Sequence, residues 1–320
     1  MDSTATDRFD TSRFEASRNR LASLAYRLLG SAADAEDAVQ DAFLHWQAAD
    51  RQRIKVPEAW LTKVVTNLCL DRLRSAQARR ERTVGAWLPE PLLDGDPMLS
   101  PADTFEQRES VSLAVLTLME RLSPLDRAVY VLREAFSYSH AEIAEILDIT
   151  ESASQQHLHR ARHRIAAARR PGGGEVDPAS VRRVVEEFLA AASSGRTERL
   201  VALLTDDATA IADSNGAGPT ETLLRYHTPQ RIAAVARAGF KPTPAKRRLV
   251  GGAPAIHYAL VNGAPAILFV LGDQVVGTVT FDITNDKIET VRGIAAPTRL
   301  ARLTEAWRQH EPKTPLITQW

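Results

Sequence analysis

The stretch from Ser137 to Arg170, "SYSHAEIAEILDITESASQQHLHRARHRIAAARR", contains two short helical patterns that meet at "DITE". Ser139 and Glu142 form a capping box at the start of the first helix. Only about two residues separate the two patterns, so the helices must cross steeply, as in a helix-turn-helix. The apolar residues that would form their shared core are Ile143, Ile146, Leu147, Ala153, Leu158, Ala161 and Ile165.

The second helix of this stretch carries a polar face rich in Gln, His and Arg, where a soluble helix usually mixes Glu with Lys. Glutamine can read adenine through two hydrogen bonds, and arginine can read guanine or hold a phosphate. Recognition helices place their first residues at base edges, so Gln155, Gln156 and His159 are expected to face bases, with arginines nearer the phosphates. The alternative is a solvated basic face without a ligand. The candidate face consists of Gln155, Gln156, His159, Arg160, Arg162, His163 and Arg164.

The composition bounds the class of protein. A chain of 320 residues with 44% hydrophobic content is long enough for two or three domains, each with its own core. The formal net charge is zero, but five arginines fall within residues 71–82 and five more within residues 159–170. Residues 90–109 carry six acids and one arginine. Two basic elements joined by an acidic connector indicate two contacts with a polyanion.

Cysteine usage and hydropathy indicate the compartment. Cys69 is the single cysteine, so neither an intramolecular disulfide nor a multi-thiolate metal site can form, which suits a reducing cytoplasm. The N-terminal residues lack an apolar signal segment, and the longest apolar run, "AILFVL", is too short to span a bilayer. We therefore expect a cytoplasmic protein without a membrane partner, cofactor or metal.

Periodicity divides the chain into successive segments. Residues 9–82 are predicted to form a small helical bundle, whose third helix starts after Pro57 and buries Trp60, Leu61, Val64 and Leu68, with Cys69 as a further candidate. Residues 83–110 are acidic and Pro-rich and predict a linker, and residues 111–170 contain the helix-turn-helix. Residues 171–178, "PGGGEVDP", predict a flexible linker. Helices followed by successive strands in residues 179–297 favour an α+β domain with an antiparallel sheet, and residues 298–320 are expected to be a tail.

Three segments together resemble a known family. "AYRLLGSAADAEDAVQDAFLHWQ", "AWLTKVVTNLCLDRLRSAQARRE" and the helix-turn-helix stretch resemble, in order and spacing, regions 2 and 4 of the extracytoplasmic-function (ECF) sigma factors of bacterial RNA polymerase. The resemblance implies two all-α domains and two partners, promoter DNA and core RNA polymerase with its β′ clamp and β flap. It assigns the polar face of the second helix to the −35 promoter element.

The resemblance also implies roles for residues of the first domain. An acidic helix would dock on the polymerase clamp, although the residues alone favour a solvated acidic face; it comprises Asp34, Glu36, Asp37, Gln40 and Asp41. The helix after Pro57 would melt the −10 element and capture an extruded base. Base capture needs edge hydrogen bonds, and cations hold the displaced strand. The candidate −10 residues are Asn67, Asp71, Arg72, Arg74, Arg79 and Arg80.

The linker carries a more particular motif. "GAWLPEP", residues 85–91, resembles the linker motif of the sigma-J type of ECF sigma factors, which carry a fused SnoaL/NTF2-like cone domain that modulates the sigma core in cis. This would make a separate anti-sigma protein unnecessary. Trp87, Leu88 and two prolines form a stiff apolar segment suited to filling a groove, either on this chain or on the polymerase. The residues proposed for interdomain regulation are Trp87, Leu88, Pro89, Glu90, Pro91, Asp213 and Pro297.

Two motifs of that subgroup are degraded here. "DSNGAG", from Asp213, stands where the subgroup has a "DGGGK"-like segment, and "APTRL", from Ala296, stands where it has an "NPDKL"-like one. Acid–base candidates in this domain are Asp213, His227, His257 and Asp282, but their spacing does not assemble a site.

Three functions therefore compete. The first is a sigma factor with cis control and no enzymatic activity, in which interdomain packing or a small-molecule effector acts through the C-terminal domain. The second is a polymerase-independent helix-turn-helix regulator, which needs no acidic clamp helix. The third is an enzyme whose N-terminal half is a tether, which predicts turnover by residues 175–297 alone.

Overall fold

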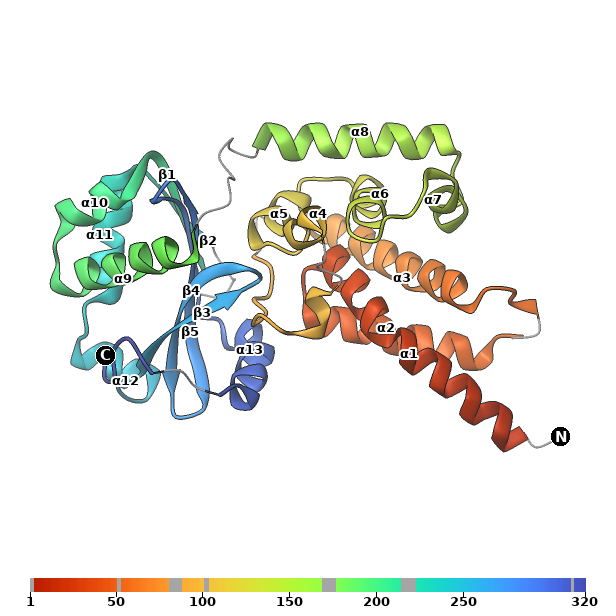
Figure 1. Cartoon of the computed structure of the whole chain (residues 1–320), viewed down its shortest axis with the longest axis horizontal. Helices are drawn as coiled ribbons and strands as arrows, with labels where there is room; N and C mark the ends of the chain where they lie inside the picture. The colour runs from red at the N-terminus through yellow and green to blue at the C-terminus, as the bar shows by residue number, and fades with distance from the viewer. Residues whose placement is uncertain are drawn as a thin grey trace. The chain divides into compact units, whose positions relative to one another are not determined.

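The computed structural model describes residues 3–50, 53–80, 88–100, 104–168, 177–213, 223–311 and 314–320 (Figure 1). The chain forms two compact units. The first contains residues 1–84 and 95–170, and the second contains residues 85–94 and 171–320. The two helical segments expected as separate domains thus lie in one unit. The expected linker over 83–110 is divided, because its described residues 88–94 belong to the second unit and its described residues from Gly95 onward belong to the first.

The first unit begins with three helices, α1 (Ser3–Leu29), α2 (Ala32–Ala48) and α3 (Pro57–Arg80). Gly30 ends α1 with a φ of 69°, and the Ser31 side chain accepts a hydrogen bond from the backbone N–H of Asp34 to start α2. Leu61 and Cys69 of α3 are buried as expected, whereas Trp60, Val64 and Leu68 are half-buried and Val65 is buried in addition. Apolar residues occur in adjacent pairs along α3, so periodicity alone does not select between the two faces.

A buried arginine holds the second part of the expected linker to α1. Residues after Gly95 form η2 (Pro97–Leu99), α4 (Phe105–Glu109) and α5 (Leu113–Met119). The Arg27 guanidinium is fully buried and donates to the backbone oxygens of Met98, Leu99 and Ser100 at 3.1–3.3 Å. Its Nε donates to Ser110 Oγ at 3.0 Å. One side chain of α1 thus organises a segment more than seventy residues away along the chain.

The helix-turn-helix follows α6 (Pro124–Glu134) and consists of α7 (His140–Leu147) and α8 (Glu151–Ala168). The capping box forms as the sequence predicts, with Ser139 and Glu142 each accepting from the backbone N–H of the other. Asp148 ends α7 in the left-handed region with a φ of 54°. The core positions Ile143, Ile146, Leu147, Leu158, Ala161 and Ile165 are buried, and Ala153 is half-buried.

The second unit contains helices and one six-stranded sheet. Its helices are α9 (Pro178–Ser194), α10 (Thr197–Leu203), α11 (Pro229–Phe240), α12 (Pro244–Val250) and α13 (Pro297–Gln309). Its strands are β1 (Leu204–Asp213), β2 (Leu223–His227), β3 (Ala255–Val261), β4 (Ala264–Leu271), β5 (Gln274–Thr284) and β6 (Lys287–Ile294). The strand order is β2-β1-β6-β5-β4-β3.

The sheet is mixed, whereas the sequence predicts an antiparallel one. Strands β3 to β6 are joined by two-residue turns, such as Asn262-Gly263 and Asn285-Asp286 with positive φ, and tight turns impose antiparallel pairing. β1 pairs with β6 in parallel. No hairpin connects these two strands, because most of the domain lies between them in the sequence, so the turn pattern does not fix their relative direction.

The expected tail over 298–320 is part of the domain. Leu300, Leu303 and Trp307 recur at i, i+3 and i+7 along α13 and are buried, which is the pattern of an amphipathic helix on a sheet. Beyond α13, the backbone of Ile317 pairs with that of Ile256 on the edge strand β3. No helix among the residues described is long and apolar enough to cross a membrane.

Candidate nucleic-acid interface

The polar face of α8 is fully displayed. Every predicted −35 residue is exposed, namely Gln155, Gln156, His159, Arg160, Arg162, His163 and Arg164. The opposite face of α8, centred on Leu158 and Ala161, packs against α6 and α7. The His140 ring nitrogen Nδ1 lies 2.8 Å from Ser154 Oγ and fixes α7 against α8. The local sequence therefore gives a rigid helix that presents one polar surface.

A buried carboxylate supports this face from beneath. Asp126 on α6 lies 2.8 Å from His157 Nδ1, 3.3 Å from Arg160 Nη2 and 3.6 Å from Arg164 Nη1. Burial opposes ionisation of Asp126, but hydrogen bonds from His157 and Ser123 and the charge of Arg160 outweigh it, so its pKa lies below the ordinary value. Asp126 is therefore ionised at neutral pH and orients two of the predicted DNA-binding arginines.

A second acid of α6 engages Arg162. The carboxylate of Glu134 lies 2.7 Å from Arg162 Nη2 and accepts from Nε at 2.9 Å. Arg162 can bind a phosphate only in competition with this pair. Within the described ranges, Gln155, Gln156 and His159 are exposed and have no such acidic partner. These three side chains therefore have the hydrogen-bonding capacity that base reading needs.

The predicted −10 residues divide into two groups. Asn67, Asp71 and Arg74 are exposed on α3, and Arg74 pairs with Asp71 at 3.1 Å. Arg72 instead turns toward α2, where it pairs with the Asp41 carboxylate at 2.6 Å and donates to the Asp34 backbone oxygen at 2.6 Å. The contacts of Arg72 thus hold α2 to α3. The side chains of Arg79 and Arg80 lie outside the described residues.

The acidic side of α2 is available to a partner. Asp34, Glu36, Asp37 and Gln40 are exposed, and Asp41 is half-buried through its pair with Arg72. The other side of α2 buries Ala35, Ala38, Val39, Ala42 and Trp46. The predicted division of this helix into an apolar face and an acidic face is therefore present.

Helix α3, which carries the predicted −10 residues, contacts the helix-turn-helix within the first unit. Lys63 Nζ on α3 lies 2.6 Å from Asp148 Oδ1 and donates to the Glu145 backbone oxygen at 2.9 Å. Thr62 Oγ1 lies 3.2 Å from the Tyr138 hydroxyl. These contacts join α3 to both ends of α7.

Within the second unit, the linker segment extends the edge strand β3. Residues 88–93 are all buried. The backbone N–H of Asp94 donates to the Leu260 oxygen at 3.0 Å, that of Asn262 donates to the Leu92 oxygen at 2.9 Å, and Leu93 pairs with Val261. Arg299 at the start of α13 donates to the Leu88 backbone oxygen. Trp87, the other apolar residue of the motif, lies outside the described residues.

Asp213 and Pro297 meet at the start of α13. The Asp213 carboxylate accepts from the backbone N–H groups of Ala295 and Ala296 at 2.9–3.0 Å, and Pro297 is the first residue of the helix. Asp213 and Pro297 thus fix the entry to α13.

The acid–base candidates are dispersed over the second unit. Asp213 binds the backbone at the start of α13, and Asp282 pairs with Arg292 at 2.7 Å. His227 is exposed at the end of β2, whereas His257 is buried on β3 beside Trp307. Since no two of them converge, the structure offers no support for acid–base catalysis by this set. In the part of the chain that the structure describes, no group of three or more His, Cys, Asp and Glu is placed to hold a metal ion.

Comparison with known proteins agrees with this geometry. The Sigma-70 region 2 model matches residues 13–79, and the Sigma-70 region 4 model matches residues 112–165. The ECF RNA polymerase sigma factor SigJ of Mycobacterium tuberculosis strain H37Rv is 43% identical over 211 residues, covering 66% of this chain and 67% of SigJ. The chain belongs to the ECF sigma factors.

Two further relatives refine this assignment. A crystal structure of the M. tuberculosis ECF sigma factor SigJ covers 91% of this ECF sigma factor and 98% of its own chain, with 31% identity and a TM-score of 0.67. SigG of M. tuberculosis strain H37Rv is 31% identical over 214 residues, which span 58% of its length. This ECF sigma factor is thus of the SigJ type, with helical sigma domains followed by a SnoaL-like α+β domain, and it acts in promoter-specific transcription initiation by RNA polymerase.

The interface of this ECF sigma factor includes residues that the sequence did not reveal. Asp126, Glu134 and His157 lie behind the predicted DNA-binding face, and Lys63 joins α3 to α7. The acids of α6 are more than twenty-five residues from their partners on α8, so no local pattern connects them. The available signal was weak: Asp126 and Glu134 are the two acids of a helix that also carries Arg127 and Arg133.

Proposed function

We propose that the chain uses α8 to read the −35 element, α3 to melt and capture the −10 element, and the acidic face of α2 to dock on the β′ clamp of core RNA polymerase. The single observation that carries this proposal is the exposed α8 face, with Gln155, Gln156 and His159 at the helix start. Such residues suit base edges, and the later arginines suit phosphates. Because polymerase is the partner, the site of action would be the cytoplasm, and the role is not catalytic.

We also propose that the first unit is a closed form. The −10 and −35 elements are about 25 base pairs apart, or roughly 85 Å at 3.4 Å per pair. In the structure, α3 and α7 are in direct contact through Lys63 and Asp148. A unit with this contact cannot place its two DNA-binding helices on both elements at once. Binding of promoter and polymerase would therefore separate α3 from the helix-turn-helix.

The second unit would control that opening by holding the linker. Residues 88–94 join the two segments of the first unit in sequence, and their backbone pairs with β3. The polar contacts of Asp94 with Gly263 and of Leu88 with Arg299 add to this pairing. When residues 88–94 are paired with β3, the linker can span a shorter distance between α3 and the helix-turn-helix. We propose that this restraint takes the place of a separate anti-sigma protein.

The experiment is run-off transcription with core polymerase and full-length variants at equal concentration. Asp94→Ala and Arg299→Ala each remove one linker contact, and Gln309→Ala on the exposed side of α13 is the matched control. We expect the first two variants to change transcript yield from the same promoter, while Gln309→Ala behaves as wild type. Equal transcript yields from the wild type and the three variants would contradict cis control. That result would not bear on the proposed promoter recognition.

A further inference from the structure

The interior of the cone in the second unit is filled by the chain itself. Phe188, Phe240, Phe269 and Phe281 form successive ring contacts, with centroids 5.0–5.7 Å apart. Trp320 completes the cluster, because its ring meets Phe269 at 5.2 Å and its Nε1 donates to the Phe240 oxygen at 2.7 Å. A ligand of this domain would therefore have to bind elsewhere or displace this core.

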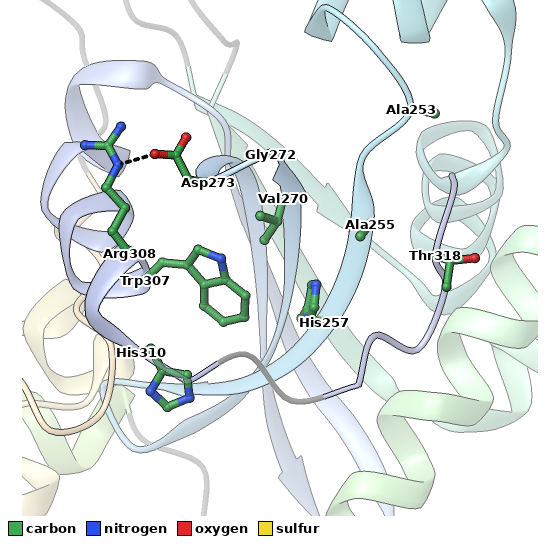
Figure 2. Close-up of a pocket in the computed structure, with 10 residues that line it drawn as sticks. All are labelled: Ala253, Ala255, His257, Val270, Gly272, Asp273, Trp307, Arg308, His310 and Thr318. Atoms are coloured by element: carbon green, nitrogen blue, oxygen red, sulfur yellow. Dashed lines mark hydrogen bonds and ion pairs between the residues drawn. The ribbon is translucent and has the colours of Figure 1, made fainter.

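A separate cavity of about 380 Å³ lies on the opposite face of the sheet (Figure 2). Ile256 belongs to the aromatic core, so its neighbour His257 points to the other face, because side chains alternate along a strand. Val270 on β4 lies on the same side as His257. The other lining residues come from the loop before β3, the start of β3, the β4–β5 turn, α13 and the segment after α13, and they are Ala253, Ala255, Gly272, Asp273, Trp307, Arg308, His310 and Thr318.

Rings dominate one wall of this cavity. The indole of Trp307 projects from α13 toward the strands, as Figure 2 shows. The His257 ring meets it edge-on at 4.9 Å, and the His310 ring lies nearly parallel to it at 5.7 Å. Aromatic rings offer apolar contact to a flat molecule, and the exposed imidazole of His310 offers one donor and one acceptor. The floor of the cavity is made of small side chains, which leaves room beside the indole.

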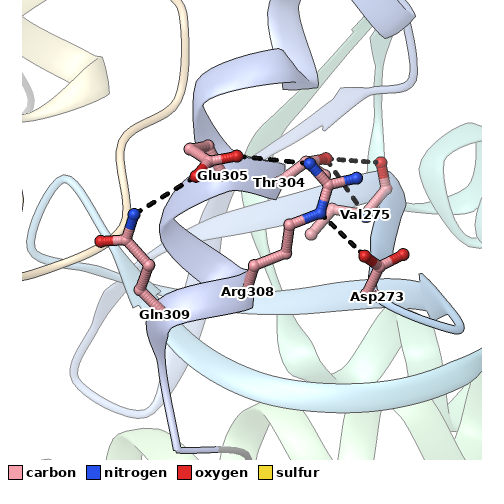
Figure 3. Close-up of polar contacts among 6 residues, drawn as sticks. All are labelled: Asp273, Val275, Thr304, Glu305, Arg308 and Gln309. Atoms are coloured by element: carbon pink, nitrogen blue, oxygen red, sulfur yellow. Dashed lines mark hydrogen bonds and ion pairs between the residues drawn. The ribbon is translucent and has the colours of Figure 1, made fainter.

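The charges at the rim neutralise each other. Arg308 Nε donates to the Asp273 carboxylate at 2.9 Å, and its Nη1 donates to Glu305 at 3.3 Å (Figure 3). Hydrogen bonds to Asp273 and Glu305 raise the pKa of Arg308, so it stays cationic. A charged ligand entering this cavity would lose hydration without gaining an unopposed counter-charge, which is unfavourable. An uncharged ligand avoids that cost.

We propose that this cavity binds an uncharged, flat nitrogen heteroaromatic molecule, which packs against the ring wall at Trp307 and hydrogen-bonds to the exposed imidazole of His310. The site lies outside the cone and is formed by residues of one unit. Its size is in the range of small-molecule pockets.

The cavity and the linker share α13. Trp307 and Arg308 line the cavity near the end of this helix, and Arg299 near its start holds the Leu88 oxygen. The polar contacts between Thr304 and Val275 tie the middle of the helix to β5 (Figure 3). A ligand that shifts α13 would thereby change the hold on the linker. This regulatory step rests on the proposed function, whereas the binding site does not.

The test is a ¹⁵N NMR titration of the full chain, followed through the indole N–H signals of its five tryptophans. Trp307→Phe and Trp320→Phe assign the two relevant signals. The probes are quinoline, which is uncharged at neutral pH, 1-naphthoate, an anion of similar size, and 1-naphthylmethylamine, a cation. We expect quinoline to shift the Trp307 signal saturably and to bind at least about tenfold more tightly than either charged probe, because burying a charge is costly.

Two variants locate the site, with a neighbour as control. Ala253→Leu fills the cavity from a half-buried loop position, and His310→Ala removes an exposed ring, so its folding is not in question. Quinoline affinity should fall in both variants and stay unchanged in Gln309→Ala. The proposal is overturned if no probe gives a saturable shift, if a charged probe binds more tightly, if His310→Ala binds as wild type, or if Trp320 in the cone responds in place of Trp307. Run-off transcription with quinoline tests the coupling separately, because it can fail while binding stands.

Discussion

Lys63 Nζ lies 2.6 Å from Asp148 Oδ1, which joins the predicted −10 helix α3 to the residue that ends α7. Both side chains are partly exposed, 37% for Lys63 and 73% for Asp148, so the pair itself contributes only about 0–1 kcal/mol. A weak contact at this place suits a unit that must open. The pair therefore offers a way to shift the closed form without damaging either domain.

Charge reversal at Lys63 should open the first unit. Lys63→Glu places two like charges together, and the double variant Lys63→Glu with Asp148→Lys restores the attraction. Ser75 on α3 and Ala166 on α8 are exposed, so spin labels attached to Ser75→Cys and Ala166→Cys report the distance between the two helices by double electron–electron resonance. Native Cys69 does not interfere, because burial raises the pKa of its thiol to about 12 and keeps it unreactive.

We expect one short distance in the wild type, added longer distances in Lys63→Glu, and recovery of the short distance in the double variant. Identical distributions in all three proteins would show that this pair does not hold the closed form.

Glutamine substitutions on α8 should alter sequence preference. Gln155→Ala or Gln156→Ala removes a side chain that can make a bidentate base contact, at a cost of about 1–3 kcal/mol at particular −35 positions. Transcription from a library with randomised −35 positions measures this as lost discrimination at those positions only. Gln309→Ala in the second unit is the control. A uniform loss of transcription across the library would indicate that these glutamines contact the DNA backbone and not the bases.

Removing a competing acid should strengthen binding to all sequences. Glu134→Gln releases Arg162 from its 2.7 Å pair and makes the cation available to a phosphate. The slope of log affinity against log salt for holoenzyme on promoter DNA should then steepen by about one. Arg162→Ala should flatten the same slope. If Glu134→Gln leaves the salt dependence unchanged, Arg162 does not contact a DNA phosphate.

Asp126 predicts a defined dependence of stability on pH. Its pKa is lowered in the folded chain, so between that pKa and the ordinary value of about 3.9 the unfolded state binds more protons and stability rises with pH. The stabilisation is complete above the ordinary value and is lost as pH falls through the lowered pKa. Urea unfolding of wild type and Asp126→Asn across this range measures it. In Asp126→Asn, the free energy of unfolding should no longer rise with pH over this acid range. If it rises with pH as steeply as in the wild type, Asp126 is not the source of the dependence.

Arg27 should control the order of the segment from Pro97 to Ser110. Arg27→Met leaves several buried backbone oxygens without their donor, and we expect a loss of about 2–4 kcal/mol in the free energy of unfolding. Hydrogen exchange should increase in η2 and α4 before it increases in α8. A uniform increase over the first unit would mean that Arg27 supports the whole core and not this segment.

Local patterns predicted the helix-turn-helix because its signals lie close together. Ser139, Glu142 and the apolar positions of α7 and α8 all act within a few residues of one another. The exposed face of α8 followed directly from the position of its core residues. The same reasoning was less exact on α3, where Leu61 and Cys69 are buried as expected but Val65 is more buried than Val64, since two adjacent apolar faces compete there.

Long-range polar contacts were beyond sequence reasoning. Three polar contacts join residues that are far apart in the chain. They are the hydrogen bond from Arg27 to the Met98 oxygen, the ion pair of Arg72 with Asp41 and that of Arg160 with Asp126. In the sequence, an arginine that faces solvent cannot be distinguished from one that pairs with an acid far away along the chain. The division of the linker between two units has the same origin, because strand pairing of Leu93 with Val261 depends on an edge strand formed much later in the chain.

The most direct measurement of the central claim is run-off transcription from a pool of genomic promoters, using core RNA polymerase with and without the full chain. The account predicts promoter-specific transcripts that require the chain and lose their −35 selectivity when Gln155 and Gln156 are replaced by alanine. Absence of transcripts, together with duplex binding that persists without polymerase, would contradict it and favour a polymerase-independent helix-turn-helix regulator.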